Sequence, residues 1–325
     1  MELICPAGTP ASYRDAIEAG ADAIYCGFRN ETNARNFPGL NFSTEEMAAA
    51  IALGRQHGVD TLVAINTFMR AGSEELWYRA VDDAVEAGAT ALIVADLGLL
   101  DYAARTWPGQ RLHLSVQASA SNSDAINFLV ESYGIRRVVL PRVLTIAEVA
   151  EVTRKVDCET EVFVFGGLCV MAEGRCSLSS YATGKSPNMQ GVCSPASHVR
   201  YRPDGREMVS ELGAFTINRF AEGESAGYPT LCKGRFSAGG QTGYIFEDPA
   251  SLDVLTHLDA LRAAGVTALK IEGRQRGRAY IAEVIRQIRQ AMADGVEAPD
   301  GPMKALRALS EGQRTTTGAY EKRWR

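Results

Sequence analysis

The feature of this chain that most constrains its fold is a regular alternation of short apolar runs with amphipathic helical segments. Continuous runs of aliphatic and β-branched residues are typical of parallel strands that are buried on both faces. Eight such runs occur along the chain: Leu3–Cys5, Ala23–Cys26, Thr61–Ile65, Ala91–Ala95, Leu112–Val116, Arg137–Leu140, Glu161–Phe165 and Ala268–Ile271.

Segments with helical periodicity fill intervals between these runs. They include Pro10–Ala19, Ser43–His57, Ser73–Ala87, Ser121–Tyr133 and Pro249–Ala264. Glu46 follows Ser43 at the spacing of a capping box, whereas Ser73 is expected to cap its helix without one. Strands that alternate with helices over short connections predict parallel pairing with right-handed crossovers. Eight units favour an α/β fold of the (βα)8 TIM-barrel type, and a doubly wound open sheet is the alternative.

The alternation is interrupted once, between the seventh and the eighth predicted strand. Residues 168–235 are polar, rich in glycine and only weakly periodic. Long irregular segments inside compact domains usually carry function. We therefore expect one barrel-like domain over residues 1–297, which includes the 168–235 insertion, followed by a tail over residues 298–325. The total of 325 residues suits a single α/β barrel.

Four of the seven cysteines fall within the insertion: Cys169, Cys176, Cys193 and Cys232. They begin just past a predicted strand, at the end where barrel enzymes build their sites, which favours metal ligation over four unrelated thiols. Structural zinc sites prefer closely paired cysteines, whereas four irregularly spaced thiolates on a long loop suit an iron–sulfur cluster. Zinc stays open as an alternative. Cys5, Cys26 and Cys158 are interpreted as small core residues.

Polar side chains follow several of the predicted strands. In a barrel the carboxyl ends of the strands converge on one face, so these side chains are expected to line a substrate site. The alternative is that each one bonds to neighbouring backbone. Arg142 and Arg274 present planar guanidinium groups that bind carboxylates in a bidentate manner, although Arg274 could instead pair with Glu272. The candidate residues are Asn66, Asp96, Gln117, Arg142, Glu272 and Arg274; no catalytic residue stands out.

Composition and motifs argue against several classes of function. The net charge of −5 disfavours a general binder of DNA or other nucleic acids. The first residues lack a basic segment followed by an apolar run, and no apolar run reaches about 18 residues, so we expect no export signal, no membrane span and a cytoplasmic location. The four histidines form neither a metalloprotease motif nor an evident serine-protease order, so peptidase activity is not expected.

The cysteine-bearing segments resemble the collagenase-like peptidase family. The matching segments are FGGLC at 165–169, EGRCSLS at 173–179, GVCSP at 191–195 and TLCKGR at 230–235. The similarity covers nearly the whole chain, including CPAG at 5–8, SVQAS at 115–119 and KIEGR at 270–274. Within the family, TNAR at 32–35 and YPT at 228–230 are most similar to the UbiU/UbiV branch of oxygen-independent ubiquinone biosynthesis.

This resemblance implies that the four cysteines of the insertion bind a 4Fe–4S cluster. It also implies oxygen-independent hydroxylation of a ubiquinone precursor, with prephenate as the hydroxyl donor, in a heterodimer with the paralogue UbiV. A lipid-binding accessory protein is a further conceivable partner. Two alternatives stay open: an RNA-base hydroxylase of the same family, and a non-catalytic iron–sulfur or zinc scaffold for a catalytic partner. The acidic net charge and the short chain weigh against the RNA alternative.

Overall fold

The computed structural model describes residues 1–169, 177–184, 193–295 and 301–321. Eight parallel strands pair in sequence order, and the last strand pairs with both the first and the seventh, which closes the sheet into a barrel. The predicted TIM-barrel-like fold is therefore confirmed, and the open-sheet alternative is excluded. The barrel strands are β1 (Glu2–Pro6), β2 (Ala23–Cys26), β3 (Asp60–Ile65), β4 (Ala91–Val94), β5 (Arg111–Leu114), β6 (Arg137–Val139), β7 (Glu159–Gly167) and β14 (Ala268–Ile271).

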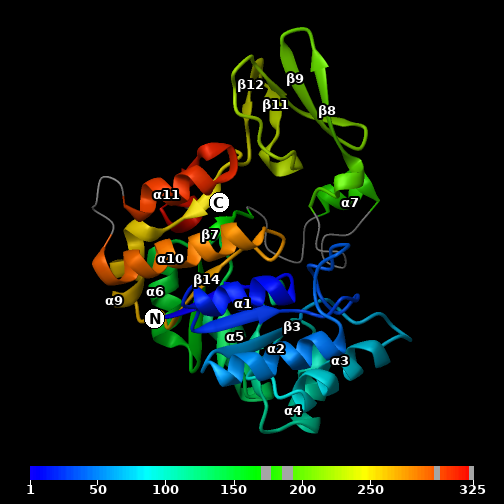
Figure 1. The fold of residues 1–325 in the computed structure, drawn as a ribbon, viewed down its shortest axis with the longest axis vertical. Helices are drawn as coiled ribbons and strands as arrows, with labels where there is room; N and C mark the ends of the chain where they lie inside the picture. The colour runs from blue at the N-terminus through cyan, green and yellow to red at the C-terminus, as the bar shows by residue number, and fades with distance from the viewer. Residues whose placement is uncertain (170–176, 185–192, 296–300, 322–325) are drawn as a thin grey trace.

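Helices cover the outer face of the barrel (Figure 1). They are α1 (Pro10–Glu18), α2 (Thr44–Gln56), α3 (Glu75–Glu86), α4 (Leu97–Thr106), α5 (Ser123–Tyr133), α6 (Ile146–Lys155), α9 (Leu258–Ala263) and α10 (Arg278–Asp294). At α2 the predicted capping box is present, because Ser43 Oγ accepts from the Glu46 backbone and Glu46 Oε2 accepts from the Ser43 backbone. The expected cap at Ser73 is wrong: α3 begins later, and its N-cap residue makes no side-chain capping bond.

Two apolar layers result from the alternation of side chains along the strands. One lies between the sheet and the helices and contains most of the core, including the fully buried Trp77. The other fills the barrel interior with residues such as Ile4, Leu62 and Ile93. The interior also contains charged side chains, which bear on the site described below.

The insertion and the residues just after it build separate antiparallel sheets beyond the barrel, drawn in green and yellow in Figure 1. Strands β8 (Val199–Asp204), β9 (Glu207–Leu212) and β10 (Phe215–Phe220) form one sheet. Strands β11 (Arg235–Ala238) and β12 (Gln241–Tyr244) form a hairpin. The expectation of an irregular segment is wrong here. These strands lack long apolar runs because much of each one is exposed.

A second correction concerns Pro249–Ala264, which was expected to be one helix. Its first part instead forms β13 (Ser251–Asp253), which pairs antiparallel with the far end of β7 and parallel with β15 (Thr315–Thr316). Strand β7 is long enough to offer this overhang beyond the closed barrel, so backbone pairing prevails over helical periodicity.

The C-terminal segment packs onto the barrel. Helix α11 (Pro302–Leu309) contacts α10, and β15 joins the overhang of β7 through β13. The buried Tyr320 donates a hydrogen bond from its hydroxyl to the Phe163 carbonyl, 2.9 Å away. The predicted division between a domain at 1–297 and a tail at 298–325 stays a prediction. Within the described ranges, no helix is both long and apolar enough to cross a membrane.

Candidate functional site

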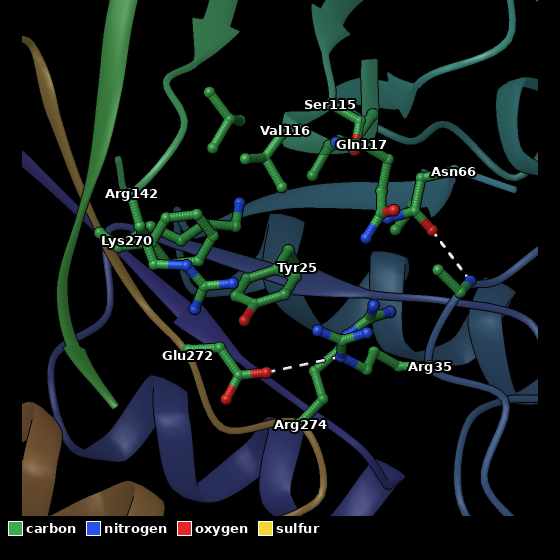
Figure 2. Close-up of a pocket in the computed structure, with 15 residues that line it drawn as sticks. Tyr25, Arg35, Asn66, Ser115, Val116, Gln117, Arg142, Lys270, Glu272 and Arg274 are labelled. Carbon is green, nitrogen blue, oxygen red and sulfur yellow. Dashed lines mark hydrogen bonds and ion pairs between the residues drawn. The ribbon is translucent and has the colours of Figure 1, made fainter. Parts of the chain in front are cut away.

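A pocket lies where the carboxyl ends of the barrel strands converge, and it encloses about 500 Å³ including its open mouth (Figure 2). Four cationic side chains and one carboxylate line it: Arg35, Arg142, Lys270, Arg274 and Glu272. Aromatic rings of Tyr25 and Phe163 form part of the wall. A chain with a net charge of −5 thus concentrates positive charge in one pocket. Such a pocket suits a small anion with more than one acidic group.

Five of the six residues expected at a substrate site line this pocket: Asn66, Gln117, Arg142, Glu272 and Arg274. That these five residues bind a substrate stays a prediction.

Asp96 has a different role. Its carboxylate is the N-cap of α4, where it accepts from the backbone N–H of Leu99 at 3.0 Å, and it also accepts from that of Met69 at 3.1 Å. At this position the backbone-bonding alternative holds.

Arg274 is buried and rigidly placed. Its Nη1 donates to Asn33 Oδ1 at 2.8 Å, and its guanidinium carbon lies 5.3 Å from the centre of the Tyr25 ring. Burial lowers the pKa of Arg274 to about 10, so it remains charged at neutral pH. A Cβ at Gly8 would stand 1.9 Å from the Arg274 carbonyl oxygen, so only glycine lets the two segments approach this closely.

Arg142 is equally buried and is held against the end of β7. Its Nη1 donates to the carbonyl oxygen of Gly167, and its guanidinium carbon stacks 4.2 Å from the centre of the Phe163 ring. A stacked guanidinium is planar and pre-oriented, so it loses little freedom when it binds a carboxylate.

Glu272 pairs with Arg35, at 3.6 Å between Oε1 and Nε, rather than with Arg274 as the alternative interpretation had it. Gly166, at the end of β7, has a φ of +117°. A Cβ at Gly166 would lie 2.2 Å from the Glu272 carbonyl oxygen. The two strand ends can meet only because this position carries no side chain.

Tyr25, Arg35 and Lys270 are among the pocket residues that the sequence did not predict. Arg35 belongs to the TNAR segment, which served only to indicate a family branch. The loop that carries it is fixed by Asn66 Oδ1, which accepts from Ala34 N–H at 3.0 Å. Lys270 could have been recognised from the sequence, because it is a charged residue within the otherwise apolar run Ala268–Ile271.

The cysteines of the insertion are only partly described, because Cys176 lies outside the described residues. Cys169 follows the end of β7, Cys193 is exposed, and Cys232 lies in a short 3-10 helix at Leu231–Lys233. The Tyr228 hydroxyl donates to the Ser194 carbonyl at 3.0 Å, which ties the segment of Cys193 to that of Cys232. Among the residues that the structure describes, no group of three or more His, Cys, Asp or Glu side chains is placed to hold a metal ion.

The other cysteines are unsuited to ligation. Burial raises the pKa of Cys26 to about 12 and the pKa of Cys158 to about 11, and it also raises that of Cys5. A metal ligand must be a thiolate, so the raised pKa values disfavour Cys5, Cys26 and Cys158 as ligands. The cluster itself stays a prediction.

Comparison with protein families gives one match over nearly the whole chain. The model of a family described as "Peptidase family U32" matches residues 8–322. Among curated proteins, the chain is 32% identical to "tRNA hydroxylation protein P" of Escherichia coli (strain K12), over 90% of this chain and 68% of that protein. It is 30% identical to "tRNA hydroxylation protein P1" of Bacillus subtilis (strain 168), over 90% of this chain and 63% of that protein.

The chain therefore spans about two thirds of the length of these curated relatives. Among solved structures, "The Structure of the U32 Peptidase Mk0906" is similar with a TM-score of 0.41 and 16% identity, covering 52% of this chain and 70% of that one.

Proposed function

The chain belongs to peptidase family U32, and from this premise we propose that it is a hydroxylation enzyme whose barrel pocket binds prephenate as the hydroxyl donor. The observation that carries the proposal is the pocket itself, where two buried guanidinium groups stack on aromatic rings. Prephenate is a dicarboxylate with a six-membered ring, so its charges and its shape match such a wall. Two relatives named for tRNA hydroxylation support the reaction class.

Each pocket residue has a part in binding under this proposal. Arg142 and Arg274 hold the two carboxylates of the donor, since each presents a planar fork. The carboxamides of Asn66 and Gln117 orient the ring substituents. Glu272 holds Arg35 by an ion pair, and it limits the positive charge of the pocket.

The acceptor that we propose is a ubiquinone precursor, as in the UbiU type of this family. The chain would act without oxygen, in the cytoplasm, as a heterodimer with a UbiV paralogue. The segments TNAR and YPT and the net charge of −5 support this choice over RNA.

Cys169, Cys176, Cys193 and Cys232 would hold a 4Fe–4S cluster. Replacing a ring hydrogen with a hydroxyl group removes two electrons from the acceptor, and a bound cluster would pass them one at a time to an external electron acceptor. The chain's own pocket residues bind and orient the donor. Arg142 connects the two regions, because it bonds to Gly167 at the end of the strand that leads to Cys169.

Hydroxylation of an RNA base is the second candidate, since the two curated relatives described above are named for tRNA hydroxylation. A peptidase is disfavoured despite the family name. Within the described part of the chain, the residues that line the pocket include no histidine and no cysteine, so the pocket offers no Cys–His or Ser–His pair.

An anaerobic deletion strain separates the candidates. We expect it to accumulate under-hydroxylated quinone intermediates, to keep its hydroxylated nucleosides, and to recover when the wild-type gene is returned. Loss of a hydroxylated nucleoside with normal quinones would contradict the quinone acceptor and establish the RNA alternative. Mass spectrometry of both pools from one culture gives the answer.

A further inference from the structure

A buried ion pair stands beneath the pocket. Lys270 Nζ lies 2.5 Å from Glu161 Oε1, and both side chains are almost wholly excluded from solvent. Lys270 lines the pocket, whereas Glu161 lies below it in the barrel interior. The Lys270 ammonium also stands 4.1 Å from the centre of the Tyr25 ring, on the pocket wall (Figure 2).

The pair continues as a column of charges toward the opposite end of the barrel. Arg137 Nη1 lies 3.5 Å from Glu161 Oε2, and that oxygen has no hydrogen-bond partner. Arg137 also pairs with Glu2 at 2.7 Å and with Glu159 at 2.5 Å, and both of these carboxylates are partly exposed. The charges thus alternate in sign from the pocket floor to the far face.

Stability does not explain this column. Barrel interiors are normally filled by branched apolar side chains. A buried ion pair costs several kcal/mol of desolvation per ion, and well-packed apolar residues often replace such pairs without loss of stability. A cation with one end at a pocket and its counter-ion behind it is the arrangement expected of a ligand-binding group.

We propose that Lys270 is a third cationic ligand-binding residue, at the floor of the pocket, and that Glu161 is the positioning residue that keeps its ammonium in place and charged. Lys270 contacts the carboxylate that reaches deepest into the pocket. An ammonium has three donors, so the bond to Glu161 leaves capacity for a ligand. This inference rests on the proposed function, because it assigns Lys270 to the dicarboxylate proposed as donor.

A pH signature distinguishes positioning from structural support. Burial lowers the pKa of Lys270, and Glu161 opposes that shift. Removing the negative charge of Glu161 lowers the pKa further, so the ammonium deprotonates as the pH rises and the anion is released. Several charged and titratable groups surround Lys270 in the pocket and in the barrel interior: Tyr25, Arg35, His113, Arg137, Arg142, Glu161, Glu272 and Arg274.

The test measures prephenate affinity by calorimetry on the full-length protein from about pH 6 to about pH 9, the range over which a buried lysine can titrate. We expect wild type to bind evenly over this range. Glu161→Gln should bind normally at the acidic end and lose about tenfold or more at the alkaline end. Lys270→Met should bind about tenfold to a hundredfold more weakly at every pH.

Two controls keep the result interpretable. Glu159→Gln removes a carboxylate at the far end of the column, so its binding should follow wild type. The double variant Glu161→Gln, Lys270→Met removes the whole pair and should fold yet bind like Lys270→Met. Wild-type affinity in the double variant, or a flat pH profile in Glu161→Gln, would overturn the assignment.

Malonate, a simple dicarboxylate, separates this inference from the identity of the donor. In one outcome, wild type binds malonate with the expected dependence on Lys270 and on pH, yet fails to bind prephenate. That outcome would support the role of Lys270 and show that the proposed donor is wrong. If neither anion binds to wild type, both proposals are wrong.

Discussion

At the scale of single residues, the pocket depends on arginines that are fixed by neighbours rather than by solvent-exposed ion pairs. Arg274 is held by Asn33 and rests on Tyr25, and Arg142 is held by Gly167 and rests on Phe163. Side chains restrained in this way lose little conformational entropy when they bind a ligand. Their geometry, and not only their charge, therefore determines affinity.

Replacement of either arginine by lysine tests that geometry. Arg142→Lys or Arg274→Lys keeps the charge and loses the planar fork, so we expect prephenate affinity to fall about tenfold to a hundredfold, the equivalent of one charge-assisted bond. Calorimetry measures the affinity. Arg278→Lys is the matched control, because Arg278 pairs with Asp15 on the surface, away from the pocket. Lower melting temperatures of the two variants with unchanged prephenate affinity would show that both arginines only stabilise the fold.

At the scale of elements, the cap of α2 has an energetic consequence that can be measured. Ser43 Oγ satisfies the Glu46 backbone N–H at the start of the helix. We expect Ser43→Ala to lower the free energy of unfolding by about 1 kcal/mol. Ser73→Ala is the matched control and should change it by less than about 0.5 kcal/mol, since Ser73 caps no helix. Equal losses of unfolding free energy in the two variants, measured by urea denaturation, would contradict a capping role for Ser43.

The insertion is the element that carries the proposed cluster. Cys176→Ala should remove the visible absorbance of anaerobically purified protein, together with most of its iron and sulfide, because a cubane needs its four thiolates. Cys158→Ala is the control and should keep full iron, since Cys158 lies at a helix–strand join of the barrel. Full iron in Cys176→Ala, or zinc instead of iron in the wild type, would contradict the cluster assignment.

The barrel strands were predictable because each is buried on both faces over most of its length and is therefore mainly apolar. Strand β8 could not be predicted from apolar runs, because most of its side chains are exposed. Strand β13 could not be predicted from its own residues, because it forms by backbone pairing with the overhang of β7. The same holds at the site. Arg142 follows a recognisable strand end, whereas Lys270 acts from inside a strand, where contacts and not periodicity reveal it.

At the scale of the whole molecule, a single strand, β7, connects the pocket to the cysteine-bearing insertion. The chain leaves the barrel through β7, whose residue Phe163 lines the pocket and whose end leads directly to Cys169. The C-terminal segment returns to the same strand through Tyr320. Only a short stretch of backbone therefore separates the pocket wall from the first cysteine of the insertion.

Assembly is predicted at this scale too. Under the proposed UbiU-type function, the chain should form a 1:1 heterodimer with a UbiV paralogue on co-expression, and light scattering measures the mass. The 35.0 kDa chain purified alone then serves as the reference. A stable lone chain with full activity would contradict the heterodimer.

Under the proposed function, prephenate bound in the barrel pocket supplies the hydroxyl group. The direct measurement is an anaerobic reaction of the heterodimer with a ubiquinone precursor and prephenate that carries ¹⁸O in its ring hydroxyl, followed by mass spectrometry of the product. We expect the heavy oxygen to appear in the hydroxylated ring, and Arg274→Lys to slow its transfer. A hydroxylated product that contains only the oxygen of water would show that prephenate is not the hydroxyl donor.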